Sequence, residues 1–315
     1  MKPILCLLII AYCLTACSTR KQSVPFTDLE TISKDESFRA NIKTGAFTKL
    51  SSGYTYYELQ SGNADTLLVF VHGFSVPSYI WDSTYNAVVK NGYGALRYDN
   101  YGRGNSDNPD VVYDVALFSN QLKELLDELK ITKPFHLIGL SDGGRTITAF
   151  ASQYPEKIKS LVYVDAVGFE TLPDTAAYPA EVSAEEIQTF KMNRYPTMAK
   201  GQMTDFYDSV PFRGWDKKYE ILMKSKGFVR ALISTNKNRR NLENEHRRIV
   251  SSGIPVYAIW GEHDTVVELN KVREPMLKRI PGVRLFVLPK AGHLPHMEQA
   301  KQFNNILLDE VILKR

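Results

Sequence analysis

The serine in Gly139-Leu140-Ser141-Asp142-Gly143-Gly144 has the sequence surroundings of an enzymatic nucleophile. The segment follows an apolar run at residues 135–139 (FHLIG) and precedes a stretch with a helical pattern. A serine between a strand and a helix must lie on a sharp turn, which neighbouring glycines permit because they carry no Cβ. The turn exposes the hydroxyl and directs the helix amino terminus toward developing negative charge. We therefore predict that Ser141 is the nucleophile and that the Asp142 backbone N–H is one donor to an oxyanion.

A nucleophilic serine needs a general base, and the chain has six histidines. His293 ends the small-residue loop Pro289-Lys290-Ala291-Gly292-His293, which follows the last strand-like run. An open parallel sheet places its site at the carboxyl ends of its strands. We predict that His293 is the base, with His296, at the start of the last helix, as the alternative. The others are expected to be structural, buried or solvated: His72, His136, His246 and His263.

The base in turn needs a carboxylate to orient it. Asp264, in Trp260-Gly261-Glu262-His263-Asp264 after the apolar run 255–260, is our prediction, and Asp165, after the run 161–164, is the alternative. Glu262 is expected to be a solvated loop charge. The second oxyanion donor is expected to be the backbone N–H of Phe74, which follows the run LLVFV and His72-Gly73.

The elements that must position these groups alternate between strand and helix. Continuous apolar runs predict strands that are buried on both faces, and an amphipathic pattern at residues 116–130 predicts a helix, as does a similar one at 303–313. We expect an α/β fold with a mostly parallel central sheet flanked by helices. Residues from about 168 to 252 have no strand pattern and are rich in aromatics and methionines, so we expect a helical cap. The predicted strands are residues 54–59, 67–71, 95–98, 135–139, 161–164, 255–260 and 284–288.

Together these motifs resemble the α/β-hydrolase superfamily over roughly residues 45–312. The matching segments are FVHGF, RYDNYGRGNSD, GLSDGG, PVYAIWGEHD and LPKAGH, and the order Ser141, Asp264, His293 is the family's order. The resemblance implies that the loop Gly102–Ser106 supports the site and that the insertion is a cap. It disfavours an aspartate nucleophile, as in epoxide hydrolases, because position 141 is serine. The Asp142 side chain is expected to be solvated, with binding of a substrate amine as the alternative.

The amino terminus has the pattern of a targeting signal. Lys2 precedes twelve uncharged residues, 3–14, which are too few to span a bilayer but suit a signal peptide. The sequence Leu14-Thr15-Ala16-Cys17 resembles the lipobox of bacterial lipoproteins, which implies a signal peptide at residues 1–16 and lipidation of Cys17. Residues 17–40 then form the lipidated terminus and a flexible tether, and residues 41–315 form the hydrolase domain. The expected location is the bacterial cell envelope, at the outer membrane rather than the inner, with the body outside the cytoplasm.

The composition excludes cysteine-based sites in the body and gives no indication of nucleic-acid binding. The three cysteines lie within the first 17 residues, so the body can hold no cysteine nucleophile, disulfide or cysteine zinc site. A charge of +4, from 39 basic and 35 acidic residues, is too balanced to indicate nucleic-acid binding. Residues 224–248 hold eight basic side chains, read as a solvated face, with an anionic-lipid surface as the alternative.

The sequence therefore predicts hydrolysis of an ester-like small-molecule acyl substrate through an acyl-enzyme. No metal and no cofactor is expected, and protein partners are not predicted. The alternatives are a C–C, amide or lactone hydrolase with the same triad, or a ligand-binding protein on this scaffold.

Overall fold

A single eight-stranded sheet forms the centre of the computed structural model, which describes residues 29–63, 65–172 and 179–313. The strand order is β1-β2-β4-β3-β5-β6-β7-β8. β1 and β2 pair antiparallel, β2 pairs antiparallel with β4, and the remaining pairs are parallel. The predicted mostly parallel sheet is thus confirmed. The strands are β1 (Ala46–Leu50), β2 (Gly53–Gln60), β3 (Leu67–Val71), β4 (Gly94–Tyr98), β5 (Phe135–Leu140), β6 (Ile158–Val164), β7 (Val256–Gly261) and β8 (Arg284–Leu288).

The central strands are buried along nearly their whole length, as their continuous apolar runs predicted. β3 and β8 have the predicted bounds. β1 was not predicted, because this edge strand (AFTKL) is only partly buried and exposes Lys49. A short antiparallel edge strand lacks the apolar run that makes a central strand visible in a sequence.

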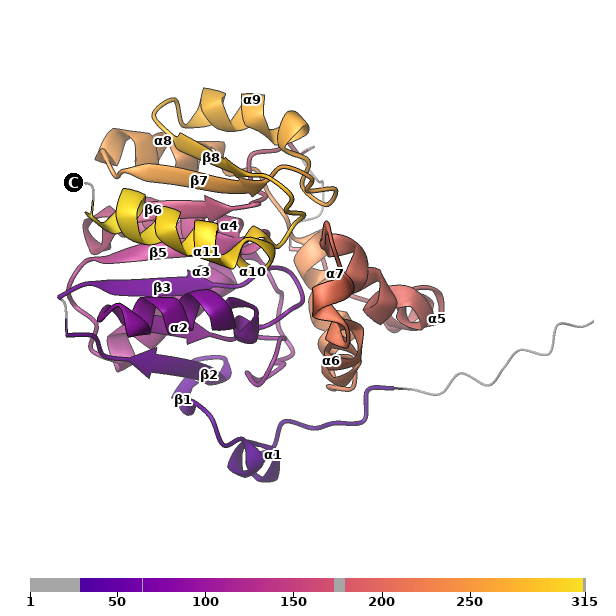
Figure 1. Ribbon diagram of the computed structural model, residues 1–315. Coiled ribbons are helices and arrows are strands. Elements are labelled where there is room, and N and C mark those ends of the chain that lie inside the picture. The colour runs from indigo at the N-terminus through magenta and orange to yellow at the C-terminus, as the bar shows by residue number, and fades with distance from the viewer. Residues whose placement is uncertain (1–28, 64, 173–178, 314–315) are drawn as a thin grey trace, which may run out of the picture.

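Helices cover both faces of the sheet (Figure 1). One face carries η1 (Ser78–Trp81), α2 (Asp82–Lys90), α10 (Pro295–Glu298), α11 (Ala300–Asn305) and the π-helical η5 (Ile306–Leu313). The other carries α3 (Val115–Glu128), α4 (Gly143–Gln153), α8 (Glu243–Ser252) and α9 (Leu269–Arg279), and the short η2 (Pro155–Lys157) precedes β6. The predicted helix at 116–130 is α3, and the predicted closing helix is divided between α11 and η5.

The insertion between β6 and β7 is helical, and its described part contains no strand from residue 168 to 252. Its first helices lie together beyond the carboxyl ends of the parallel strands (Figure 1), where they form the cap. α8, which the predicted boundary of about 168–252 includes, instead packs on the body, because Ile249 belongs to the core beneath α4. The cap elements are α5 (Ala184–Gly201), η3 (Gln202–Asp205), η4 (Val210–Phe212), α6 (Trp215–Leu222) and α7 (Phe228–Lys237).

The first described residues before β1 contact the cap. Ile32 forms a parallel β-bridge with Ser225, and the Glu30 carboxylate is 2.9 Å from Lys191 Nζ on α5, with both side chains buried. Residues 29–40 were expected to belong to a flexible tether, so the described part of that segment differs from the prediction. It contacts the cap through a buried ion pair, which a polar sequence does not reveal. α1 (Glu36–Asn41) follows.

The signal peptide predicted at residues 1–16, and Cys17 itself, lie outside the described residues. Among the residues that are described, no helix is both long enough and apolar enough to cross a membrane.

Candidate active site

Ser141 lies on a strained turn at the carboxyl end of β5. Its φ is +51°, a left-handed conformation that non-glycine residues rarely adopt, and its N–H donates to Val164 O at 2.9 Å. The Gly144 N–H donates back to Ser141 O at 2.9 Å. A Cβ on Gly143 would lie 2.6 Å from His72 O, so the close approach of the turn to β3 requires glycine there. The glycines that suggested a sharp turn in the sequence are needed for backbone contact.

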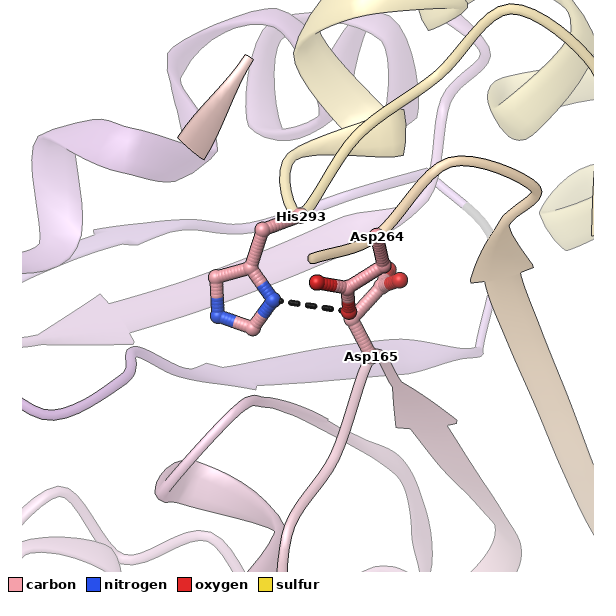
Figure 2. A group of neighbouring side chains, drawn as sticks. All are labelled: Asp165, Asp264 and His293. Carbon is pink, nitrogen blue, oxygen red and sulfur yellow. Dashed lines mark hydrogen bonds and ion pairs between the residues drawn. The ribbon is translucent and has the colours of Figure 1, made fainter. Parts of the chain in front are cut away.

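His293 and Asp264 form a hydrogen-bonded pair beneath the cap (Figure 2). The distance between His293 Nδ1 and Asp264 Oδ2 is 2.9 Å, and both residues are buried. The backbone N–H groups of Val266 and Val267 donate to Asp264 Oδ1 at 2.8 and 2.9 Å. Burial acts to raise the pKa of Asp264, but the bonds from His293 and the backbone hold it below its ordinary value. Asp264 is therefore a carboxylate oriented toward Nδ1, which leaves Nε2 of His293 for proton transfer.

Asp165, the alternative acid, lies next to Asp264 (Figure 2). It is fully buried, and its Oδ1 accepts the Gly261 N–H at 2.8 Å. Burial and the nearby charge of Asp264 raise the pKa of Asp165 well above its ordinary value, which favours the neutral form of this carboxyl. The ligand atoms of Asp165, Asp264 and His293 lie within 4.8 Å of one another, as in a metal site. The His293 Nδ1 that would bind a metal is already engaged with Asp264, so the arrangement is that of an oriented base.

Ser141 and His293 line one cavity of about 170 Å³. Within the described residues no hydrogen bond joins their side chains, and such contacts are often long before a substrate binds. The cavity is lined on the body side mainly by apolar residues, and cap element η3 contributes Gln202 and Asp205. The Asp205 carbonyl accepts the His293 N–H at 2.7 Å. The cap thus holds the backbone of the candidate base.

Phe74 and Asp142 flank the nucleophile. A Cβ on Gly73, beside Phe74, would lie 3.1 Å from Ser141 Cβ, so that loop passes directly over the serine. In the described structure neither the Phe74 nor the Asp142 N–H donates to a protein acceptor, and Asp142 immediately precedes α4. Two such N–H groups beside Ser141 are suited to bind an oxyanion.

The Asp142 side chain was expected to be solvated, and the structure shows that it is not. It is buried and pairs at 3.0 Å with Arg239, which follows α7. The pair lies outside the cavity that Ser141 lines, so the substrate-amine alternative has no support either. Arg239 could not be recognised from the sequence, because within residues 224–248 it is one of several basic side chains that were expected to be solvated.

A second arginine, Arg103, holds the other flanking residue. Its Nε donates to Phe74 O at 2.7 Å, and another guanidinium nitrogen donates to Thr235 Oγ1 on α7 at 2.9 Å. Burial lowers its pKa to about 10, so the group remains charged at neutral pH. The guanidinium carbons of Arg103 and Arg239 each lie 5.5 Å from the centre of the Phe74 ring. Arg103 belongs to the loop Gly102–Ser106, which the resemblance implied would support the site.

The remaining histidines have other contacts. His72 accepts the Asn100 N–H through Nε2 at 2.9 Å, so its Nδ1 donates to Gly73 O at 2.8 Å and supports the Phe74 loop. His296, the alternative base, bonds Ile80 O at 3.0 Å through Nε2 and does not line the cavity. The other three contact residues away from Ser141: His136 bonds Ser160, His246 stacks on Phe169, and His263 stacks on Tyr207.

Several cations of the basic stretch 224–248 are paired within the protein. This reduces the positive charge available to an anionic lipid surface and favours the reading of an ordinary protein face. The ion pairs are Arg230–Asp110, Lys237–Glu186, Arg239–Asp142, Arg240–Glu245 and Arg247–Glu243.

A family model described as the alpha/beta hydrolase fold matches residues 66–300. Since this match covers most of the chain, the chain belongs to the α/β-hydrolase family, and its relatives place it among the hydrolases. It is 24% identical to Lipase 3 of Moraxella sp. (strain TA144) over 93% of this chain and 92% of the lipase. It is 27% identical to a 2-hydroxy-6-oxononadienedioate/2-hydroxy-6-oxononatrienedioate hydrolase of Pseudomonas sp, over 79% of this chain and 89% of that hydrolase.

Solved structures agree on the fold. An esterase (EaEST) from Exiguobacterium antarcticum superposes with a TM-score of 0.71 at 22% identity, over 85% of this chain and 99% of the esterase.

Proposed function

We propose that the chain is a serine hydrolase that cleaves a small carboxylic ester through an acyl-enzyme intermediate. The observation that carries the proposal is the His293–Asp264 hydrogen bond at the wall of the cavity that also exposes Ser141. The strained turn at Ser141 and the unengaged N–H groups beside it support the same chemistry. The lipase relative and the esterase of like fold are consistent with an ester substrate.

The proposed reaction begins when His293 Nε2 takes the proton from Ser141 Oγ, which attacks the ester carbonyl. The Phe74 and Asp142 N–H groups stabilise the resulting oxyanion, and the positive end of α4 adds to that stabilisation. His293 then protonates the departing alcohol. Water, activated by the same histidine, attacks the acyl-enzyme and releases the acid. Throughout the cycle Asp264 fixes the tautomer of His293 and stabilises the imidazolium.

Replacement of the nucleophile tests the proposal. We expect Ser141→Ala to lower kcat on p-nitrophenyl butyrate by roughly four to six orders of magnitude, because the hydroxyl forms the covalent bond. Wild type should be labelled covalently by a fluorophosphonate probe, and the variant should not. Ser37→Ala, an exposed serine on α1, is the matched control and should keep both properties. Full esterase activity in Ser141→Ala would overturn the proposal, and a binding protein would fail to label even as wild type.

A second candidate is cleavage of a C–C bond by the same residues. The 27% identity to the hydroxyoxononadienedioate hydrolase favours it over amide or lactone hydrolysis. Comparing kcat/KM for esters, thioesters, amides, lactones and β-diketone-like substrates, in wild type and in Ser141→Ala, distinguishes these reactions.

We also propose that the protein is a lipoprotein of the bacterial cell envelope, anchored through Cys17 after removal of residues 1–16. The Leu14-Thr15-Ala16-Cys17 motif supports this location, as does the confinement of cysteine to the first 17 residues.

A further inference from the structure

The cavity at Ser141 has a polar wall on its cap side. Its body side is mostly apolar, with Val76, Ile80 and Leu140 among its lining residues. From the cap, η3 adds an amide and a carboxyl, those of Gln202 and Asp205. Neither group takes part in the acyl-transfer steps described above, so both are open to another role.

The Asp205 carboxyl accepts no hydrogen bond from the described part of the protein, although its backbone is held in place. Its carbonyl accepts the His293 N–H at 2.7 Å, which fixes its backbone beside the candidate base. By contrast, another buried carboxylate, Asp99, accepts from Ser78 and Asn105. A partly buried carboxylate without a donor is costly, and a ligand that supplies one recovers that cost.

The electrostatics around Asp205 also favour a ligand that donates a hydrogen bond to it. Burial and the charge of Asp264 raise its pKa, and His293 acts in the opposite direction, which leaves the pKa at about 6. The carboxyl is therefore charged at neutral pH. It faces His293 and Asp264, and an anionic substrate group placed beside these two carboxylates would be repelled.

We propose that Asp205 and Gln202 form a substrate subsite for a hydrogen-bond donor, either a hydroxyl or an ammonium group, carried by a short-chain ester. The subsite rests on the proposed esterase function and specifies its substrate class. The cavity of about 170 Å³ is smaller than the roughly 300–1,000 Å³ of sites for drug-sized ligands, which favours a short acyl chain. An ester with a methyl group at the position of the donor leaves Asp205 unpaired. An ester with a carboxylate at that position is repelled by the charge of Asp205.

Matched esters test the subsite. On the acyl side, ethyl butyrate, ethyl 3-hydroxypropanoate and β-alanine ethyl ester differ only in the terminal group, which is methyl, hydroxyl or ammonium. Monoethyl malonate, with one methylene fewer, places its carboxylate oxygens at that position. On the alcohol side, propyl butyrate and 2-hydroxyethyl butyrate differ in the same way. We expect kcat/KM at pH 7.5 to be about tenfold higher for the donor-bearing ester in at least one series, and lowest for the malonate half-ester. This ratio should fall below pH 6, where Asp205 becomes protonated.

Variants separate the two donor classes. Asp205→Leu should bring the ratio of donor-bearing to methyl-bearing ester close to one. Asp205→Asn keeps an acceptor but no charge, so it should lose preference for ammonium more than for hydroxyl. Asp208→Asn, an exposed acid of the same cap segment, is the control and should leave the ratio as in wild type.

A failure of the proposed subsite can be distinguished from a failure of the proposed esterase function. If ethyl butyrate is cleaved in a Ser141-dependent reaction but the ratios are near one, or are equal in wild type and Asp205→Leu, the subsite is wrong and the esterase proposal stands. If no ester is cleaved and no fluorophosphonate labels Ser141, the proposed function fails and the subsite fails with it.

Discussion

Three aspartates surround His293, and their environments give them different states. Asp264 is charged because His293 and two backbone N–H groups donate to it. The pKa of Asp165 is raised, which favours its neutral form, because it is fully buried next to Asp264. Asp205 has a pKa of about 6 in the cavity wall. Side chains of one type therefore serve as an orienting carboxylate, a neutral support and a candidate substrate ligand, according to burial and neighbours.

The pH dependence of hydrolysis should follow His293. Burial alone would lower its pKa, but the hydrogen bond and charge of Asp264, together with the charge of Asp205, raise it above its ordinary 6.5. The base is active when deprotonated, so kcat/KM on ethyl butyrate should rise with pH through a midpoint above 6.5. Asp205→Asn removes one raising charge and should move this midpoint to lower pH. A midpoint below 6.5 in wild type, or an unchanged midpoint in the variant, would contradict the assignment.

Helix α7 connects the cap to both flanks of the nucleophile. Arg103 joins Thr235 on α7 to the Phe74 carbonyl, and Arg239, just after α7, pairs with Asp142. The two candidate oxyanion donors are thus oriented by arginines that contact one cap helix. The position of the cap should therefore affect the stabilisation of the oxyanion as well as the shape of the cavity.

Removing the Arg239–Asp142 ion pair tests whether the cap affects stabilisation of the oxyanion. Arg239→Gln leaves the buried Asp142 carboxylate without its cation and should lower kcat on ethyl butyrate about tenfold with little change in KM. This is less than the roughly 10²–10³-fold loss for deleting an oxyanion donor outright, because the N–H itself remains. Arg240→Gln, whose side chain pairs with Glu245, is the control. A loss confined to KM, or one equal to the control's, would argue against a positioning role.

In the whole molecule, the segment before the sheet connects the amino terminus to the cap. Glu30 is paired with the buried Lys191, and it also accepts the Val229 N–H of α7 at 2.8 Å. From Cys17 to Leu29 the chain can span at most roughly 40 Å. A lipid anchor at Cys17 would therefore hold the cap within that distance of the membrane surface.

The anchor can be tested in a bacterial host. Wild type should fractionate with membranes and incorporate labelled palmitate. Cys17→Ala should not incorporate palmitate and should keep its specific activity on ethyl butyrate, because the described fold begins twelve residues later. Palmitate incorporation by Cys17→Ala would contradict anchoring at this cysteine. Cys13→Ala, within the predicted signal peptide, is the control and should behave as wild type.

Much of the fold was predictable because central parallel strands are buried on both faces. A strand that is buried on both faces has a continuous apolar sequence, as β3 does. The turn at Ser141 was predictable for a similarly local reason, since a positive φ and close backbone approach demand glycines around it. The edge strand β1 was not, because partial burial leaves no such pattern.

The sequence by local rules alone placed Ser141, His293 and two aspartates at the ends of strands. Only the tertiary structure decided which aspartate meets His293, that Arg239 reaches Asp142, and that Glu30 lies on the cap. The physical reason is that backbone conformation and burial depend on neighbours in sequence. Contacts between side chains 29, 97 and 161 positions apart depend instead on how the loops at the strand ends and the helices of the cap pack together.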